Sequence, residues 1–172
     1  MPELTPVLPA AEIDRLIEDL AQRISSDYRG RDLVLIAVLK GAFIFLSDLV
    51  RKLSIPVKID FVQAASYGSG NVSCGQVRLT KELGLDIRNK DVLLVEDIID
   101  TGLTIDYLLD YLRGFQPRSL AVCALIDKRE RREREVPAAY IGRVIAKGFL
   151  VGYGLDHAEA YRHLPGIYDL SL

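Results

Sequence analysis

Two kinds of hydrophobic pattern alternate along the chain. Residues 13–24 place apolar side chains on one helical face with charged residues between them, which predicts an amphipathic helix that ends near Gly30. Nearly continuous apolar runs predict buried strands. These runs are residues 33–39, 92–95 and 120–126, and residues 57–62, after Pro56, predict another strand. Strands that alternate with helices are typical of an α/β domain with a mainly parallel sheet.

Residues 92–104 join a buried strand to a helix through an acidic turn. Val92 to Val95 predict the strand, and Thr104 is the predicted N-cap of a helix whose apolar residues then recur at helical spacing. The free backbone N–H groups at a helix start, together with the helix dipole, favour an anion such as a phosphate. The sequence therefore predicts a phosphate-binding loop at the end of a strand.

The side chains of this loop suit a sugar phosphate. Gly102 lets the backbone approach an anion closely, and Thr101 adds a hydroxyl donor, as does Thr104. Glu96 and Asp97 supply carboxylates that can accept hydrogen bonds from sugar hydroxyls or help to hold Mg²⁺. The alternative is that these acids only solvate a loop and cap a helix. Their position directly after an apolar strand favours the sugar phosphate.

The stretch from Val95 to Gly102 resembles the phosphoribosyl diphosphate (PRPP) binding motif of type I phosphoribosyltransferases. The resemblance covers roughly residues 33–164. It implies the fold of that family, a mainly parallel central sheet flanked by helices with a small hood. It also implies that Asp100 hydrogen-bonds the purine N7 as general acid or base. Many relatives carry a lysine where this chain has Leu103, which removes one phosphate charge, although bacterial-type members tolerate an apolar residue there.

Lys40 and Gly41 lie between the strand predicted at 33–39 and a second helix, which is apolar on most sides and therefore predicted to be deeply buried. Because ligands of open α/β sheets collect beyond the carboxyl ends of the strands, this pair predicts a second anion site. The alternative is a lysine at the sheet edge whose charged end reaches solvent. The resemblance places the pyrophosphate loop here and implies a cis peptide bond between Leu39 and Lys40.

Residues 66–75 are rich in turn formers and have no apolar period. A long loop of this kind is typical of a lid, and a lid would protect a reactive sugar intermediate from water. The resemblance places a mobile loop here that begins with Ser66 and Tyr67. Cys74 lies inside it and carries no argument for catalysis.

A mixed run of basic and acidic residues, 128–134, follows the strand predicted at 120–126. Such runs are usually solvated faces, and a net charge of −2 gives no indication of nucleic-acid binding. Lys128 either opens this solvated run or turns inward to donate to an exocyclic oxygen. In hypoxanthine-guanine phosphoribosyltransferases a lysine at the matching place contacts the purine 6-oxo group, which favours the second interpretation.

Residues 147–156 resemble the purine-binding segment of the same enzymes. The resemblance implies that Phe149 stacks on the base and that the backbone near Leu150 contacts its edge. It also implies that Asp156 binds a metal, as Glu96 and Asp97 would, and that Arg162 faces pyrophosphate. An aromatic ring offers a flat apolar wall to a planar base, and arginine suits phosphate oxygens. Taken alone, Phe149 would more often be a core residue and Asp156 a loop acid.

Length and composition set the remaining limits. The 172 residues suit one domain, with a core at about 30–140 and a hood formed by the N-terminal part and about 141–172. No segment is both long and apolar enough to span a bilayer, and residues 1–9 lack a signal-peptide pattern. Two cysteines cannot build a disulfide framework, so a cytoplasmic protein is expected.

These expectations combine into a Mg²⁺-dependent purine salvage enzyme. It would convert hypoxanthine or guanine and PRPP into IMP or GMP and pyrophosphate, and the family pattern favours a homodimer or homotetramer. The alternatives are a phosphoribosyltransferase for xanthine or adenine and a PRPP-sensing transcription regulator of the same fold. A dinucleotide-dependent oxidoreductase is disfavoured because no G-x-G-x-x-G follows a strand.

Overall fold

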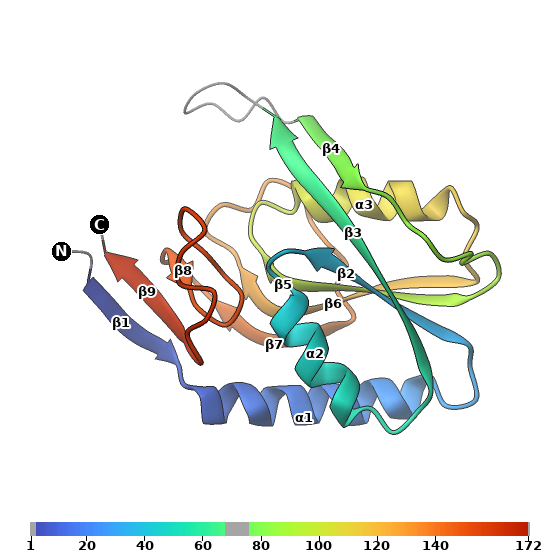
Figure 1. Cartoon of the computed structure of the whole chain (residues 1–172), viewed down its shortest axis with the longest axis horizontal. Coiled ribbons are helices and arrows are strands. Elements are labelled where there is room, and N and C mark those ends of the chain that lie inside the picture. Colours follow the sequence, from blue (N-terminus) through green and yellow to red (C-terminus); the bar gives the residue numbers. More distant parts are fainter. Residues whose placement is uncertain (1–2, 68–75, 172) are drawn as a thin grey trace.

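The computed structural model describes residues 3–67 and 76–171. Six strands form its main sheet in the order β4-β3-β2-β5-β6-β7 (Figure 1). Their bounds are β2 Leu33–Leu39, β3 Val57–Tyr67, β4 Gln76–Lys81, β5 Asp91–Ile99, β6 Ser119–Lys128 and β7 Tyr140–Ile145. Neighbouring strands are parallel except for the antiparallel pair β3 and β4. The predicted mainly parallel sheet is therefore confirmed.

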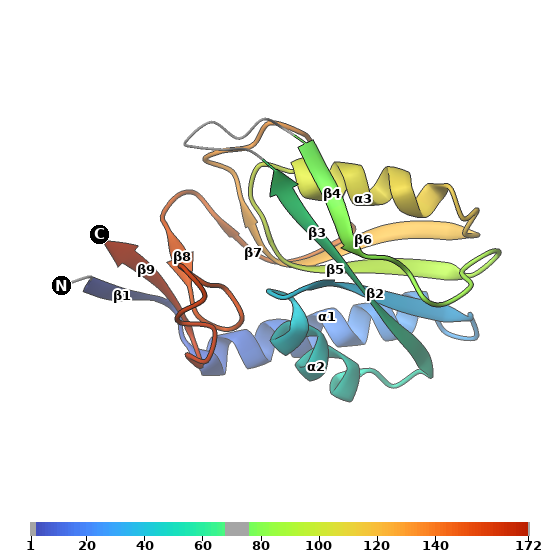
Figure 2. The same cartoon turned by 45° about the horizontal axis from the view of Figure 1, so that its top comes forward.

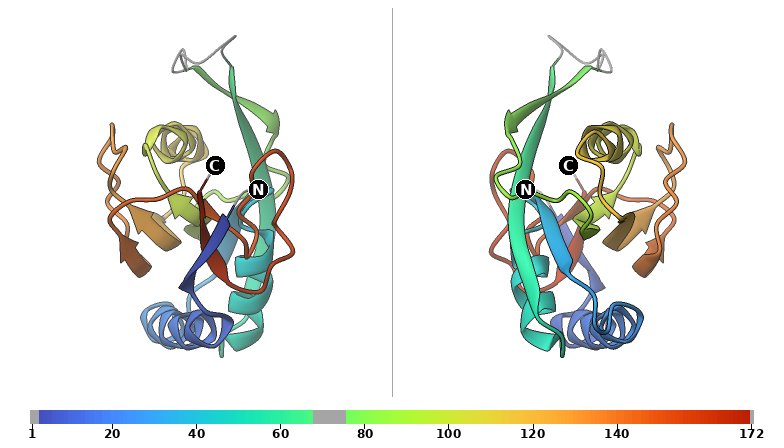
Figure 3. Two further views of the ribbon diagram at one scale, coloured as in Figure 1. Left: turned by 90° about the vertical axis from the view of Figure 1, so that its left-hand side faces the viewer. Right: turned by 90° about the vertical axis from the view of Figure 1, so that its right-hand side faces the viewer.

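Helices cover both faces of this sheet. Helices α1 (Ala10–Asp27) and α2 (Phe43–Lys52) lie on one face and α3 (Leu103–Arg113) on the other, as Figures 2 and 3 show. Alternate residues of β2 belong to opposite cores, because Leu35 packs in the cluster with α1 and α2 and Ile36 in the cluster with α3. A strand buried on both faces needs apolar side chains throughout, which explains the unbroken apolar runs.

A second, three-stranded sheet brings the two chain ends together. Its order is β1-β9-β8, with β1 at Glu3–Leu8, β8 at Leu150–Val151 and β9 at Ile167–Ser171 (Figure 1). The main sheet reaches Ile145 through β7, beyond the predicted end of the core at about 140. The sequence did not predict β7 or the three strands of this second sheet. Strand β1 gives little signal because most of its side chains are exposed. The division of one domain into core and hood stays a prediction.

The turn before α3 differs from the prediction. Gly102, and not Thr104, is the N-cap, so Thr104 lies in the first turn of the helix and its predicted capping role is wrong. Gly102 has a φ of +84°, and a Cβ atom there would lie 2.2 Å from the backbone oxygen of Arg134. A left-handed backbone conformation this close to another backbone segment requires glycine. Gly102 therefore lets the loop before α3 pack directly against the backbone of Arg134.

Helix α2 is less buried than predicted. Phe45 and Leu49 are fully buried, whereas Phe43 is 45% exposed. The helix therefore buries one face, as expected for an amphipathic helix, and leaves an aromatic side chain on the surface. Among the described residues, no helix is long and apolar enough to cross a membrane.

Candidate active site

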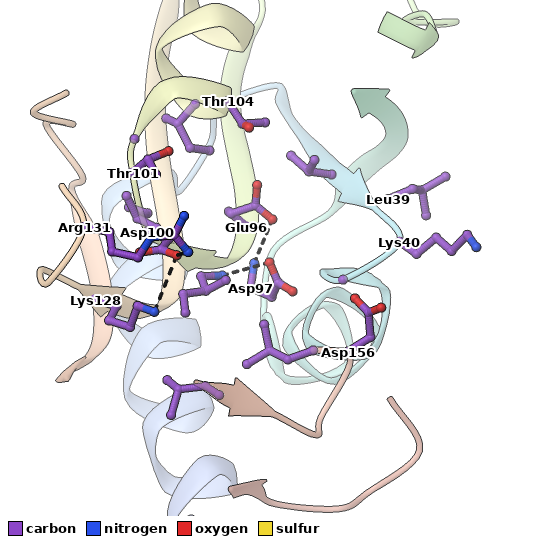
Figure 4. Close-up of a pocket in the computed structure, with 18 of the residues that line it drawn as sticks. Leu39, Lys40, Glu96, Asp97, Asp100, Thr101, Thr104, Lys128, Arg131 and Asp156 are labelled. Atoms are coloured by element: carbon purple, nitrogen blue, oxygen red, sulfur yellow. Dashed lines mark hydrogen bonds and ion pairs between the residues drawn. The ribbon is translucent and has the colours of Figure 1, made fainter. Parts of the chain in front are cut away.

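A cavity of about 400 Å³ lies at the carboxyl ends of β2, β5 and β6 (Figure 4). Thirteen of the predicted site residues line it. They are Lys40, Gly41, Glu96, Asp97, Asp100, Thr101, Gly102, Thr104, Lys128, Phe149, Leu150, Asp156 and Arg162. Leu103 does not line it. The cavity thus joins segments that are more than 100 residues apart in the sequence.

The predicted lid falls almost entirely outside the described residues. Ser66 and Tyr67 form the end of β3, where their backbones pair with Val77 and Gln76 of β4. Residues 68–75, which include Cys74, lie beyond the part of the chain that the structure describes. The lid therefore stays a prediction.

The loop before α3 is held by its backbone and leaves the helix start open to an anion. The backbone oxygen of Thr101 accepts hydrogen bonds from the N–H groups of Glu133 at 2.8 Å and Arg134 at 2.9 Å. The N–H of Leu103 donates to the Thr101 hydroxyl at 3.3 Å. The N-cap residue Gly102 has no side chain, so the N–H groups that follow Leu103 in the first turn can donate to a phosphate.

Two carboxylates are buried at the end of β5. Glu96 and Asp97 are each 7% exposed. Burial, and then the neighbouring charge of Asp97, raises the pKa of Glu96 well above its ordinary value. Burial also raises the pKa of Asp97, although hydrogen bonds to its carboxylate oppose this. Two buried carboxylates on adjacent residues favour a cation or several hydroxyl donors beside them.

Gly41 allows this acidic pair to meet the turn between β2 and α2. A Cβ atom at Gly41 would fall 1.9 Å from Oδ2 of Asp97, so the carboxylate lies directly against the glycine backbone. The peptide bond between Leu39 and Lys40 is cis, as the resemblance implied. The β2–α2 turn and the end of β5 therefore form one continuous wall of the cavity.

The donor set suits a Mg²⁺ ion that is shared with a substrate. Mg²⁺ usually binds one or two protein carboxylates and takes its other ligands from phosphates and water. Within residues 3–67 and 76–171, no three His, Cys, Asp or Glu side chains group closely enough to hold a metal by themselves. Glu96, Asp97 and Asp156 consequently do not form one closed ligand set. The buried pair fits an ion whose remaining ligands come from a sugar diphosphate.

Lys128, at the end of β6, turns inward toward the cavity. Its side chain is buried, and Nζ donates to the backbone oxygen of Gly148 at 3.0 Å and lies 3.5 Å from Oδ2 of Asp100. This placement excludes the interpretation of Lys128 as the start of a solvated run. Phe149 is 41% exposed beside it, so its ring is not a core residue. Oδ1 of Asp100 is buried, and no described atom donates to it.

Lys40 and Arg162 both contact the exposed carboxylate of Glu159. Nζ of Lys40 lies 2.7 Å from Oε2 of Glu159 and points away from the loop that contains Asp100 and Thr101 (Figure 4). Nη2 of Arg162 lies 3.1 Å from Oε1 of the same glutamate and 3.0 Å from Oδ1 of Asp156. Hydrogen bonds from Lys40 and then Arg162 lower the pKa of Glu159.

Residues 7–158 match the family described as the phosphoribosyl transferase domain. The chain belongs to the phosphoribosyltransferase family. It is 46% identical over 168 residues to a hypoxanthine phosphoribosyltransferase of Escherichia coli strain K12, covering 96% of this chain and 94% of that protein. It is 40% identical over 165 residues to a hypoxanthine-guanine phosphoribosyltransferase of Staphylococcus aureus strain Mu50, covering 96% and 92%.

A solved structure agrees with these sequence comparisons. A crystal structure of a hypoxanthine-guanine phosphoribosyltransferase from Bacillus anthracis matches with a TM-score of 0.91 and 38% identity, covering 99% of this chain and 100% of that chain. The resemblance found in the sequence and the α/β phosphoribosyltransferase fold are both confirmed.

Three residues of this phosphoribosyltransferase site were missed. Glu159 contacts both Lys40 and Arg162, Arg131 lines the cavity 3.5 Å from Asp100 Oδ2, and Arg132 is buried behind it. Contrary to the prediction that residues 128–134 form a solvated face, Arg132 is buried, whereas Arg131 lines the cavity with a side chain that is 63% exposed. Their place directly after a strand's carboxyl end was the available signal. Glu159 gave a weaker one, because it lies three residues before Arg162.

Proposed function

We propose that this chain transfers the 5-phosphoribosyl group of PRPP to hypoxanthine or guanine, giving IMP or GMP and pyrophosphate in purine salvage. The main support for this proposal is the arrangement of Lys128, Asp100 and Phe149. A buried lysine donor, Lys128, lies 3.5 Å from the carboxylate of Asp100 and beside the exposed ring of Phe149. A planar base with an oxo group next to a ring nitrogen matches that donor, acceptor and aromatic wall. The names of the relatives described above support the same substrates.

The loop from Asp100 to Thr104 binds the 5′-phosphate, far from the bond that breaks. Backbone N–H groups and the helix dipole hold the phosphate, and this remote binding energy fixes the position of the sugar C1′ atom. Glu96 and Asp97 accept hydrogen bonds from the ribose hydroxyls. Their carboxylates also stabilise the positive charge that develops on the sugar as the C1′–O bond breaks.

The opposite wall receives the leaving group. Lys40 and Arg162 take up charge on the departing pyrophosphate, and the planar guanidinium suits its oxygens. Mg²⁺, when bound, neutralises further charge on that leaving group. Glu96 and Asp97 would hold the ion together with oxygens of PRPP, and Asp156 supplies a carboxylate on the pyrophosphate side.

The base binds between Phe149 and the strand ends. Phe149 stacks on the ring, the backbone near Leu150 contacts its edge, and Lys128 donates to the 6-oxo group. Asp100 hydrogen-bonds N7 and acts as general acid or base while N9 forms its bond to C1′. A positive donor at the 6-position disfavours adenine, whose 6-amino group is itself a donor.

Mixing the chain with PRPP, Mg²⁺ and hypoxanthine tests this function. The expected result is nucleotide and pyrophosphate in equal amounts, with no turnover when any one of the three is omitted. PRPP binding without turnover would instead favour the PRPP-sensing regulator. A cytoplasmic location and a homodimer or homotetramer stay predictions, and gel filtration of the active enzyme would test the second.

A further inference from the structure

A buried arginine joins the two strand ends that carry the groups facing the base. Nε of Arg132 donates to the backbone oxygen of Asp100 at 2.9 Å. Nη2 donates to the backbone oxygens of Ile99 at 3.3 Å and Lys128 at 3.1 Å, and it forms an ion pair with Asp127. The Arg132 side chain is only 8% exposed. One guanidinium thus contacts the backbone on both sides of the gap between β5 and β6.

This contact lies where the sheet itself stops. The last paired residues of β5 and β6 are Ile99 and Asp127. Asp100 and Lys128 follow directly, so no ladder hydrogen bond fixes their separation. Arginine suits this place because its planar fork carries five donors in a fixed geometry. Arg132 therefore continues the connection between the strands by one residue.

The neighbouring phosphate loop has a separate anchor. The backbone oxygen of Thr101 is held by the N–H groups of Glu133 and Arg134, and no side chain takes part. Adjacent carbonyl groups, those of Asp100 and Thr101, are thus fixed by different means. Loss of the Arg132 side chain removes the first anchor and leaves the second in place.

We propose that Arg132 is a positioning residue that sets the separation of Asp100 and Lys128 and thereby the affinity and turnover of the base. The proposal rests on the proposed function, since it assigns the base to these two groups. A displacement of about 1 Å in such groups can lower a rate about 100-fold. The effect should fall on the base and not on PRPP, because the phosphate loop keeps its own hydrogen bonds.

Arg129 provides a matched control. It also forms an ion pair with Asp127, through Oδ2, but its side chain is 59% exposed. Its hydrogen bonds go to that carboxylate alone among the described residues. Arg129→Met therefore removes the same charge from the same partner without touching the backbone of either strand end.

Steady-state kinetics of Arg132→Met, Arg132→Lys and Arg129→Met against the unmodified enzyme test the proposal. We expect Arg132→Met to lower kcat/KM for hypoxanthine about 100-fold and to leave the KM for PRPP within about twofold of its original value. Arg132→Lys should lose about tenfold, because an ammonium group can keep the Asp127 pair but cannot span both strand ends. Arg129→Met should behave as the unmodified enzyme.

Arg132→Lys keeps the test decisive if Arg132→Met does not fold. A folded Lys variant, checked by its melting temperature, with unchanged kcat/KM for hypoxanthine would overturn the proposal. Equal increases in both KM values would also overturn it, because they would indicate general loosening of the site. Turnover by the unmodified enzyme, measured first, separates these outcomes from failure of the proposed function.

Discussion

The two ends of the cavity are built in different ways. At the end that we propose binds the 5′-phosphate, residues 96–104 form one continuous stretch, and the donors are backbone N–H groups fixed by the fold. At the end that we propose binds pyrophosphate, Lys40 and Arg162 come from distant segments, and both contact Glu159. Backbone donors carry no full charge and need no counter-ion, whereas charged side chains attract a nearby carboxylate. A ligand therefore meets a prepared loop at one end and an ion pair that it must replace at the other.

Asp100, where the phosphate loop meets the base, should give the largest effect. We expect Asp100→Asn to lower kcat at least about 100-fold, because general acid–base catalysis typically contributes 10²–10⁴-fold. PRPP binding should change little, since the asparagine keeps the backbone of the loop. Rapid-quench turnover and calorimetric PRPP titration would measure the two effects. Equal losses in turnover and in PRPP affinity would contradict the catalytic role.

A substitution at Gly102 tests the loop before α3 directly. We expect Gly102→Ala to raise the KM for PRPP more than about tenfold, because an alanine is strained at a φ of +84° and its Cβ would clash with the Arg134 carbonyl. The matched control is Gly30→Ala. Gly30 also has a positive φ of +74°, but nothing lies within 4 Å of the added Cβ.

Steady-state kinetics of both glycine variants would make that comparison. The control should lose some stability and keep its KM for PRPP. Similar KM values in the two variants would show that the closeness of the loop to Arg134 does not govern phosphate binding.

The buried acids of the same stretch should reduce stability in the absence of ligands. Because burial raises the pKa of Glu96 and Asp97, these two groups bind protons more tightly in the folded chain than in the unfolded one, so their contribution to stability is greatest below about pH 4 and falls as pH rises through the raised pKa values. We expect Glu96→Gln to raise the free energy of unfolding at neutral pH by roughly 1–3 kcal/mol while lowering activity.

Thermal unfolding at several pH values would measure this effect. The gain in melting temperature should be about 2–4 °C for each kcal/mol and should shrink as the pH falls toward 4. A gain of the same size at all pH values would contradict the assignment of the cost to the buried charge.

The smallest effect is expected at Glu159. Removing its charge with Glu159→Gln should strengthen pyrophosphate binding only a few-fold, because the ligand no longer has to displace a carboxylate and exposed ion pairs contribute little. Calorimetric titration would measure it, and added salt should reduce the difference. Glu12→Gln, which removes a carboxylate paired with Arg143 on the surface, is the control. Weaker pyrophosphate binding would show instead that Glu159 orients the two cations.

Periodicity and local chemistry predicted the parts of the fold that bury the most apolar surface. The run at Leu33–Leu39 was predicted with its correct bounds, because a strand buried on both faces leaves no polar gaps. The short strands β1, β8 and β9 were missed, since β1 pairs with β9 at the opposite end of the chain and β8 has only two residues. Phe43 on α2 was expected to be buried, but a composition that is apolar on most sides does not say which side faces solvent.

In the site, too, local features were predicted from the sequence and contacts between distant segments were not. The phosphate loop was recognisable because its residues are contiguous and each has a local reason to be there. Arg132 and Glu159 act through contacts that form only when distant segments meet, so their residue types alone indicated solvated charges. Lys128 lay between these cases, and its inward orientation became clear only from its burial against Gly148.

The central claim is that Lys128 and Asp100 select a 6-oxopurine, and a ranking of bases tests it most directly. Values of kcat/KM would be measured for hypoxanthine, guanine, xanthine and adenine with saturating PRPP and Mg²⁺, for the unmodified enzyme and for Lys128→Met. We expect hypoxanthine and guanine to exceed adenine by at least about 100-fold, and this preference to collapse in Lys128→Met. Turnover of adenine equal to that of hypoxanthine, or an unchanged ranking in the variant, would contradict the account.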